Sequence, residues 1–265
     1  MDERDVAAAW DDNAASWAAR VRAGHDMYRE HYNNPAMLEF IGDLRGKQVL
    51  DAGCGEGYQT RLLARRGARM TGIDLSPRMI DLAREEERRE PLGIRYEQGS
   101  FTELRPFADQ MFDAAVSFMA LMDGPDFPAA MREMRRLLKP GGELVFSILH
   151  PVNTRGFGWI RDSRGEETHF TLAEYFNQEP FVERWNFSRA PDANEAPMFT
   201  VPYFRGTLSH YLNSVIQSGL VLTALHEPQP SEAACREYPW LARWRKHAPL
   251  FLYVRAARPA RRAAE

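Results

Sequence analysis

Three glycines at alternate positions, Gly53, Gly55 and Gly57, link an apolar stretch to a helix-forming one in "VLDAGCGEGYQTRLLA" (residues 49–64). Glycine has no Cβ, so the backbone here can adopt conformations closed to other residues, and a ligand can approach the main chain. The helix that follows presents free amides and the positive end of its dipole to oxygen-rich groups. The pattern therefore predicts a nucleotide-like ligand, and the alternative is a tight turn that needs glycine only for packing.

The spacing of the glycines excludes two common nucleotide loops. A dinucleotide fingerprint needs its third glycine at the position of Tyr58, and a P-loop needs Gly-Lys-Ser/Thr. Asp74 instead ends the next apolar stretch, where a carboxylate can accept hydrogen bonds from two vicinal ribose hydroxyls. Because Ser76 and Pro77 already supply the start of a helix, Asp74 is not needed as its cap.

Alternating strands and helices must position these residues. A helical region over 4–42, broken at 33–35, precedes them. Strands that alternate with amphipathic helices predict parallel strands, crossover helices and a doubly wound α/β sheet. We expect a turn at 139–142 and a polar, aromatic loop before the last strand. The expected strands are 48–52, 69–75, 94–99, 112–119, 143–149, 220–227 and 249–257, and the later helices are 57–67, 76–90, 127–138 and 207–219.

Four successive segments, "VLDAGCGEGYQT", "MTGIDLSPRMI", "FDAAVSFMALMD" and "LLKPGGELVFSI", resemble the signature blocks of class I S-adenosylmethionine-dependent methyltransferases of the small-molecule type. The resemblance is close over residues 44–150 and looser over the C-terminal helix and two strands. It implies a mostly parallel, seven-stranded Rossmann-like sheet whose last strand is antiparallel. We expect an N-terminal helical lid (1–43) and a methyltransferase domain (44–265), with a substrate-binding insertion (151–206) after the fifth strand.

The resemblance implies S-adenosylmethionine as the cofactor. It assigns the glycine loop to the methionine part, Asp74 to the ribose, and residues 117–119 to the sulfonium end. Ser100 departs from the family, because many relatives have Asp there, but its hydroxyl can still hydrogen-bond the adenine amino group. The full set of cofactor residues is Arg29, Asp51, Gly53, Cys54, Gly55, Gly57, Asp74, Leu75, Met79, Ser100, Phe101, Ser117, Phe118 and Met119.

The segment "GHDMYREHY" (24–32) precedes the core domain. In similar small-molecule methyltransferases this segment covers the cofactor, and an arginine there can bind the cofactor's carboxylate with two parallel hydrogen bonds. We therefore expect this role for Arg29, and the alternative is an ordinary surface arginine.

Proton abstraction is needed only when the methyl acceptor arrives protonated. His150 follows the fifth strand at its carboxyl end, where ligands bind in open α/β sheets, so it is a candidate general base. The alternative is a histidine that shapes the turn before Pro151. The insertion is rich in aromatic residues, which favours an apolar or aromatic pocket. The catalytic candidates are His150, Tyr28 and Tyr203, and the substrate-binding candidates are Tyr32, His150, Trp159, Trp185, Tyr203 and Arg205.

We expect methyl transfer to oxygen, nitrogen or carbon of a small, apolar or aromatic metabolite, by in-line displacement. Two alternatives are a non-catalytic S-adenosylmethionine-binding or partner-binding domain and a protein or RNA methyltransferase. A net charge of −3 and a pI near 6.2 give no basic field for nucleic acid or an anionic membrane. We expect no metal, no nucleic-acid partner and no membrane, and the sequence leaves a homodimer open.

The cysteines and the first ten residues give an expectation for the cellular compartment of the protein. Cys54 and Cys235 make no metal-ligand or disulfide pattern, residues 1–10 lack a signal peptide's apolar core, and no run approaches 18 apolar residues. We therefore expect a cytoplasmic protein, and the arginine-rich basic set, with only three lysines, indicates a bacterial source.

Overall fold

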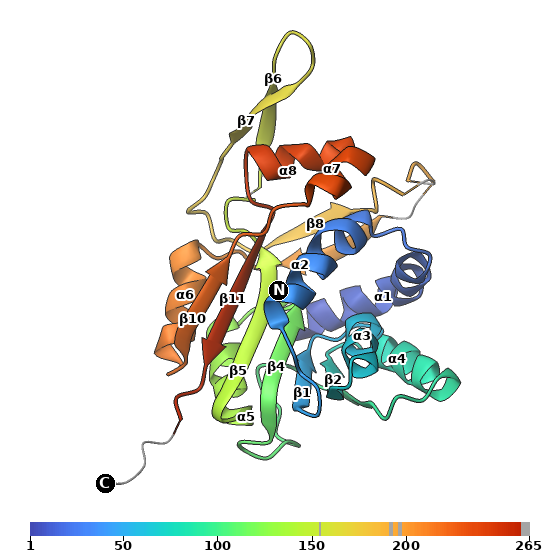
Figure 1. The fold of residues 1–265 in the computed structure, drawn as a ribbon, viewed down its shortest axis with the longest axis vertical. Coiled ribbons are helices and arrows are strands. Elements are labelled where there is room, and N and C mark those ends of the chain that lie inside the picture. Colours follow the sequence, from blue (N-terminus) through green and yellow to red (C-terminus); the bar gives the residue numbers. More distant parts are fainter. Residues whose placement is uncertain (154, 191–192, 196–197, 261–265) are drawn as a thin grey trace.

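The computed structural model describes residues 1–153, 155–190, 193–195 and 198–260. Its central feature is a seven-stranded sheet in the order β10-β11-β5-β4-β1-β2-β3 (Figure 1). Strands β1 to β5 run parallel, whereas β11 runs antiparallel to both of its neighbours. The predicted mostly parallel sheet with an antiparallel last strand is confirmed. The strands are β1 Gln48–Ala52, β2 Arg69–Asp74, β3 Arg95–Gln98, β4 Phe112–Phe118, β5 Leu138–Leu149, β10 Val221–His226 and β11 Phe251–Ala257.

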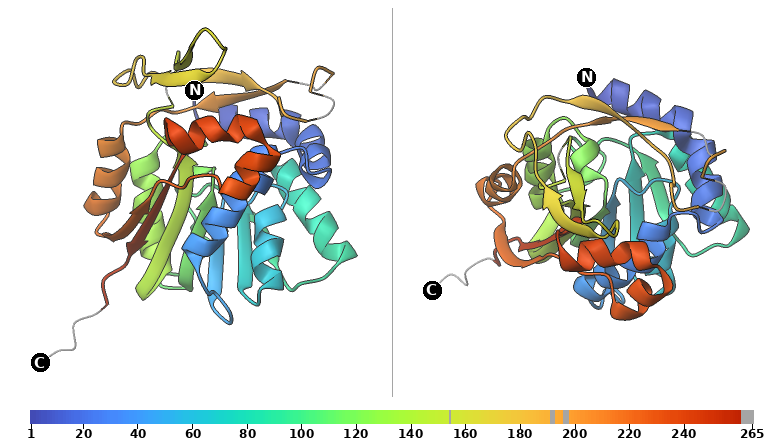
Figure 2. Two further views of the ribbon diagram at one scale, coloured as in Figure 1. Left: turned by 45° about the horizontal axis from the view of Figure 1, so that its top comes forward. Right: turned by 90° about the horizontal axis from the view of Figure 1, so that it is seen from above.

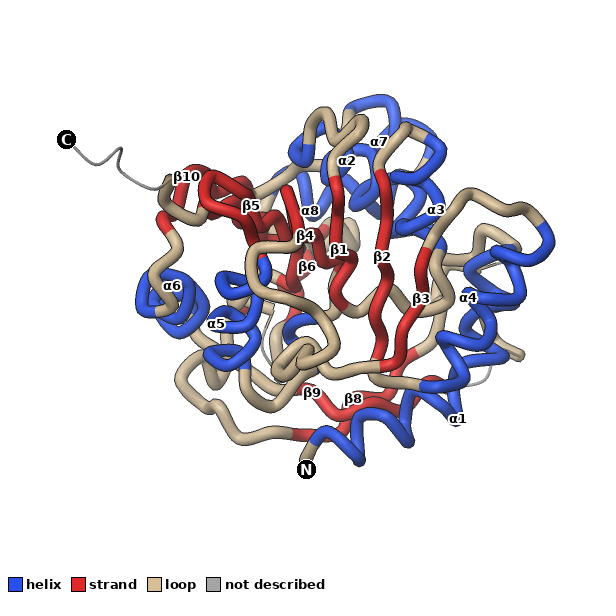
Figure 3. Tube along the Cα trace, turned by 90° about the horizontal axis from the view of Figure 1, so that it is seen from below, coloured by secondary structure: helices blue, strands red, loops and turns tan. Residues whose placement is uncertain are grey.

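Helices cover both faces of this sheet (Figure 3). Alternation along β1 sends Leu50 to a core shared with α5 and α6, and Val49 to a core shared with α2, α3 and α4. Helix α5 is typical: Asp126 caps it by accepting the N–H of Ala129 (2.8 Å), and its apolar stripe is buried. The helices are α1 Glu3–Arg22, α2 Asn34–Ile41, α3 Tyr58–Arg65, α4 Pro77–Arg89, α5 Phe127–Leu137, α6 Leu208–Gln217, α7 Glu232–Glu237 and α8 Ala242–Lys246, with a π-helix η1 (Arg29–Asn33) and 3₁₀-helices η2 (Leu121–Asp123) and η3 (Pro239–Leu241).

Three segments differ from the expected elements. The N-terminal helical region breaks at residues 23–26, where Gly24 (φ +73°) ends the run of α1, and not at 33–35, where η1 continues directly into α2. Strand β5 begins at Leu138, so it includes residues 139–142, which we expected as a turn. The register against β4 shifts there, because Phe112 pairs with Leu138 but Ala114 pairs with Glu143, and the intervening residues bulge from the strand. The expected loop before β11 instead contains α7, η3 and α8, whose short helices lack a long periodic pattern.

The insertion forms two antiparallel hairpins, β6 (Gly158–Arg161) with β7 (Glu167–Thr171) and β8 (Phe181–Trp185) with β9 (Phe199–Tyr203). Together with α1 they lie across the end of the sheet where the parallel strands terminate (Figure 2). Helix α1 contacts both β9 and α4, so it joins the insertion to the core. Of the helices described here, none is both long and apolar enough to cross a membrane.

Candidate functional site

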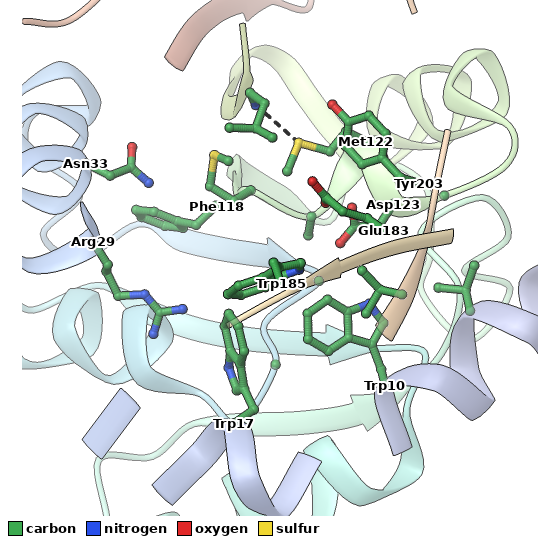
Figure 4. A pocket seen from close by; sticks show the side chains of 18 of the residues that line it. Trp10, Trp17, Arg29, Asn33, Phe118, Met122, Asp123, Glu183, Trp185 and Tyr203 are labelled. Atoms are coloured by element: carbon green, nitrogen blue, oxygen red, sulfur yellow. Dashed lines mark hydrogen bonds between the residues drawn. The ribbon is translucent and has the colours of Figure 1, made fainter. Parts of the chain in front are cut away.

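A cavity of about 680 Å³ lies at the carboxyl ends of the parallel strands, where open α/β sheets bind ligands. The loops after β1, β2 and β4 form its floor, and residues of α1, η1 and the β8–β9 hairpin form its roof (Figure 4). The N-terminal helix and the insertion, far apart in the sequence, therefore enclose the same space.

The three glycines of the loop have different roles. Gly53 (φ +79°) passes so close to Ala120 that a Cβ would lie 2.3 Å from the Cβ of that residue. A Cβ at Gly57 (φ +87°) would lie 2.5 Å from the hydroxyl oxygen of Tyr96. Gly55 (φ +55°) lines the cavity, and its missing Cβ would face open space. Gly53 and Gly57 thus permit close packing, and Gly55 leaves room for a ligand beside the backbone.

Asp74 lies in the cavity wall and anchors this loop. Its Oδ2 accepts the N–H of Gly55 (2.8 Å) and its Oδ1 accepts the N–H of Ser76 (2.9 Å). Burial raises the pKa of Asp74 to about 6, against the opposing effect of these two amides. A carboxylate has about four acceptor positions, so Asp74 retains capacity for ligand hydroxyls, which fits the predicted ribose contact.

The predicted adenine edge is closed by the first turn of α1. Ser100 donates its hydroxyl hydrogen to Oε1 of Glu3 (2.6 Å), and Thr102 donates to the same oxygen (2.6 Å). Glu3 lines the cavity together with Ser100 and Phe101. A carboxylate therefore stands at this edge although residue 100 is Ser, and it comes from a part of the chain that the sequence did not suggest.

Arg29 projects toward the cavity beside the glycine loop. Its Nε contacts Oδ2 of Asp26 (3.2 Å), and its guanidinium carbon lies 5.2 Å from the ring centre of Trp17 and 5.5 Å from that of Tyr58. The Nη1 atom is buried without a hydrogen-bond partner among the described residues. A buried donor without a partner is costly, so a ligand carboxylate is its natural complement. The residues present therefore fit the methionine carboxylate of S-adenosylmethionine.

Three of the predicted cofactor residues lie below the cavity rather than in its wall. Asp51 accepts the hydroxyl of Thr60 (2.6 Å), and burial raises its pKa to about 7. Ser117 donates to the carbonyl of Ala52 (2.6 Å), and Gly57 begins α3. The other predicted cofactor residues line the cavity: Arg29, Gly53, Cys54, Gly55, Asp74, Leu75, Met79, Ser100, Phe101, Phe118 and Met119.

Three of the predicted catalytic and substrate-binding residues also line the cavity: Tyr28, Trp185 and Tyr203. The hydroxyl oxygen of Tyr28 accepts a hydrogen bond from Nη2 of Arg243 (3.2 Å). Trp185 meets Trp17 edge to face, with ring centres 5.5 Å apart, so the roof joins the insertion to α1.

Three other predicted substrate residues point elsewhere. Tyr32 is buried in the core beside β11 and donates to the carbonyl of Pro228 (2.6 Å). Trp159 packs on Trp244 (5.1 Å between ring centres), and the Arg205 guanidinium lies over Phe181 outside the cavity wall. Their role in substrate binding stays a prediction that the cavity does not support.

His150 lies in the turn after β5 and does not line the cavity. Its Nδ1 accepts the N–H of Val152 (3.2 Å), and its Nε2 lies 2.9 Å from Oε1 of Glu227. Burial lowers the pKa of His150, and Glu227 opposes that change. These contacts favour the turn-shaping alternative, and the catalytic role of His150 stays a prediction.

Asp123 and Glu183 are two further carboxylates of the cavity lining that the sequence analysis did not single out. Asp123 ends η2, shortly after β4, and Glu183 lies in the middle of β8. The position of Asp123 past a parallel strand was a usable signal, because ligands gather at such strand ends. Glu183 gave no such signal, because its orientation depends on the register of a hairpin inside the insertion.

Comparison with known proteins identifies the family. The family described as "Methyltransferase domain" matches residues 50–146. A crystal structure of an S-adenosylmethionine-dependent methyltransferase from Mesorhizobium loti is 30% identical, with a TM-score of 0.70, over 84% of this chain and 96% of that one. A putative S-adenosylmethionine-dependent methyltransferase from Listeria monocytogenes, 24% identical, shares the fold with a TM-score of 0.66 over 89% of this chain and 98% of that one.

Two curated relatives are named by their reactions. The ubiquinone biosynthesis O-methyltransferase of Alkalilimnicola ehrlichii is 36% identical over 45% of this chain and 50% of that protein. The malonyl-[acyl-carrier protein] O-methyltransferase of Serratia marcescens is 32% identical over 56% of this chain and 54% of that protein. The chain thus spans about half the length of these curated relatives. The fold, the glycine loop after β1 and the similarity to the Mesorhizobium loti structure all indicate the same family. This chain belongs to the class I S-adenosylmethionine-dependent methyltransferases.

Proposed function

We propose that this chain transfers the methyl group of S-adenosylmethionine to a small molecule bound in the same cavity. The observation that carries the proposal is that cofactor residues such as Asp74 and Arg29 and aromatic residues of the insertion such as Trp185 line one continuous space. When bound, S-adenosylmethionine supplies an electrophilic methyl group on its sulfonium. The products are the methylated acceptor and S-adenosylhomocysteine, with release of a proton when the acceptor arrives protonated.

The chain's own residues bind, align and shield the reactants. Asp74 holds the ribose and Arg29 the carboxylate, while Leu75, Met79 and Phe101 enclose the adenine. Helix α1 and the β8–β9 hairpin cover the cavity above the cofactor residues, and the in-line displacement itself mainly needs alignment.

The size and lining of the cavity support a small acceptor with an apolar or aromatic body. A volume of about 680 Å³ lies in the range of small-molecule sites. Beyond the cofactor residues, the cavity is lined by Phe181, Trp185, Tyr203, Asp123 and Glu183. We call this part of the cavity the acceptor half. The curated relatives that methylate oxygen support methyl transfer to a small acceptor, and nitrogen and carbon remain in the proposal.

A transfer assay tests this function. Purified protein is incubated with S-adenosylmethionine carrying a radiolabelled methyl group and a bacterial extract separated into small-molecule, protein and RNA fractions. We expect label in the small-molecule fraction with the wild type and at least tenfold less with Asp74→Asn. Label confined to protein or RNA would contradict the acceptor class, and no transfer to any fraction, despite cofactor binding, would favour a non-catalytic binding domain.

A further inference from the structure

Asp123 and Glu183, from distant parts of the chain, meet in the acceptor half of the cavity (Figure 4). Asp123 belongs to η2 on the floor of the cavity, and Glu183 belongs to β8 in its roof. Neither side chain makes a hydrogen bond or ion pair with any described residue. Nearly all ionised carboxylates in buried surroundings have a hydrogen-bond or ion-pair partner. Asp123 and Glu183 therefore lack the partner group that such carboxylates normally have.

The electrostatics of this pair point to a positively charged ligand group. Burial raises the pKa of Asp123 well above its usual range, and the nearby charge of Glu183 raises it further. Burial likewise raises the pKa of Glu183. Two carboxyls held together in an apolar wall each disfavour the ionised form of the other, whereas a cation between them stabilises both ionised forms.

Tyr203 gives an independent indication of a polar ligand at this position. Its side chain is buried, with the residue only 8% exposed, yet its hydroxyl has no hydrogen-bond partner among the described residues. Figure 4 shows it beside Asp123 and Glu183; burial raises the pKa of Tyr203, and both carboxylates add a smaller contribution in the same direction. Tyr203 lines the cavity, so its hydroxyl is available to hydrogen-bond a ligand group at this position.

Among the residues that the structure describes, the arginines that line the cavity near this pair do not fill this role. Arg243 reaches the cavity but is engaged by Glu167 (3.2 Å), and Arg155 is exposed at the rim, with its guanidinium carbon 5.7 Å from the ring centre of Phe181. Neither forms an ion pair with Asp123 or Glu183. A metal ion fits poorly, because within the described ranges no third histidine, cysteine or carboxylate joins these two as a metal cluster would need.

We propose that the methyl acceptor is a small amine whose ammonium group binds between Asp123 and Glu183. For transfer to that nitrogen, the ammonium first gives one proton to a carboxylate of the pair; the nitrogen lone pair then forms the N–C bond as the S–C bond breaks and S-adenosylhomocysteine leaves. The hydroxyl of Tyr203 contributes a further hydrogen bond, and the apolar body lies against Phe181 and Trp185, whose ring faces also attract a cation. This inference rests on the proposed function, because it names the acceptor class for the same cavity.

Ligand binding in the presence of saturating S-adenosylhomocysteine tests it. The probes are a panel of small arylalkyl and alkyl amines, each matched by the alcohol and the carboxylate of the same skeleton, screened by thermal shift and followed by calorimetry. We expect amines among the ligands that raise Tm, with dissociation constants at least about tenfold lower than those of their alcohols. Carboxylates should not bind.

Isosteric variants locate the effect. Asp123→Asn and Glu183→Gln should each weaken amine binding at least about tenfold, because each leaves the ammonium without one charged partner. Glu179→Gln removes an exposed carboxylate just before β8 and should leave amine binding unchanged. Circular dichroism and S-adenosylhomocysteine affinity report whether each variant is folded, and Glu183→Gln, at a hairpin, tests the pair if Asp123→Asn fails to fold.

Each outcome decides the inference. A panel in which alcohols or carboxylates bind as tightly as amines, or in which no amine binds, would overturn it, as would amine binding that both variants leave unchanged. If S-adenosylhomocysteine binds but the protein shows no preference for amines, only this inference is wrong and the proposed function stands. Wild-type protein that fails to bind S-adenosylhomocysteine removes the proposed function itself.

Discussion

Gly55 donates its backbone N–H to Oδ2 of Asp74 across 2.8 Å, which ties the glycine loop after β1 to the end of β2. The register of these strands, with Ala52 opposite Ile73, brings the two segments to the same height. Asp74 thus holds the glycine-loop backbone that faces the ligand, and its carboxylate is also the group that we assign to the ribose. A substitution at Asp74 therefore affects both contacts.

Replacing Asp74 should therefore weaken cofactor binding strongly. Asp74→Asn removes the charge from hydrogen bonds worth on the order of 1.5–3 kcal/mol, so the dissociation constants of S-adenosylmethionine and S-adenosylhomocysteine should rise about ten- to hundredfold. Calorimetry measures the change. Asp81→Asn, an exposed carboxylate on α4, serves as the control, and equal affinities in the two variants would exclude Asp74 from the site.

The same carboxylate predicts a pH dependence. Its pKa is raised to about 6 by burial, and ribose hydroxyls bind its ionised form better, so binding releases a proton below that pH. Affinity for S-adenosylhomocysteine should be constant from pH 7 to 8 and fall as the pH drops through about 6. Titrations at pH 5.5 and 7.5 should differ for the wild type but not for Asp74→Asn. A flat wild-type profile would argue against a titrating Asp74 in the binding site.

The segment that carries Arg29 should become better protected from hydrogen exchange when the cofactor binds. Arg29→Ala removes the only guanidinium that we assign to the cofactor carboxylate and should weaken S-adenosylhomocysteine binding about tenfold or more, whereas Arg4→Ala, exposed on α1, should not. Hydrogen exchange of residues 20–35 should slow when S-adenosylhomocysteine is present. If both variants changed the affinity for S-adenosylhomocysteine equally and hydrogen exchange did not change, this segment would have only a packing role.

Local patterns made much of the fold predictable. Strands β1 and β2 end where the apolar stretches end, and Asp74 follows from that position alone. Pairings across long sequence distances were not accessible: Glu3 meets Ser100, and Glu183 meets Asp123, only once α1 and the insertion have folded over the sheet. For His150, the strand-end rule gave the location but not the direction of the side chain, which local turn contacts determine.

His150 should therefore contribute more to stability than to chemistry. His150→Ala removes the contacts to Val152 and Glu227 and leaves a space in a buried turn, so the free energy of unfolding should fall by about 1–3 kcal/mol in denaturant titrations. Because burial lowers the pKa of His150, its stabilising contribution in the wild type is present above about pH 6.5 and is lost as the pH falls through its folded pKa. Turnover of a methyl acceptor at saturating concentration should change less than threefold. A loss of 10²- to 10⁴-fold in turnover, with stability unchanged, would restore His150 as the general base.

The central claim is that one cavity holds the cofactor at Asp74 and Arg29 and presents its sulfur to the acceptor half. A crystal structure with S-adenosylhomocysteine tests it most directly. We predict the two ribose hydroxyls on the Asp74 carboxylate, the ligand carboxylate on Nη1 of Arg29, and the sulfur facing the part of the cavity lined by Asp123, Glu183 and Tyr203. A ligand bound outside this cavity, or one whose sulfur faces away from the acceptor half, would contradict the account.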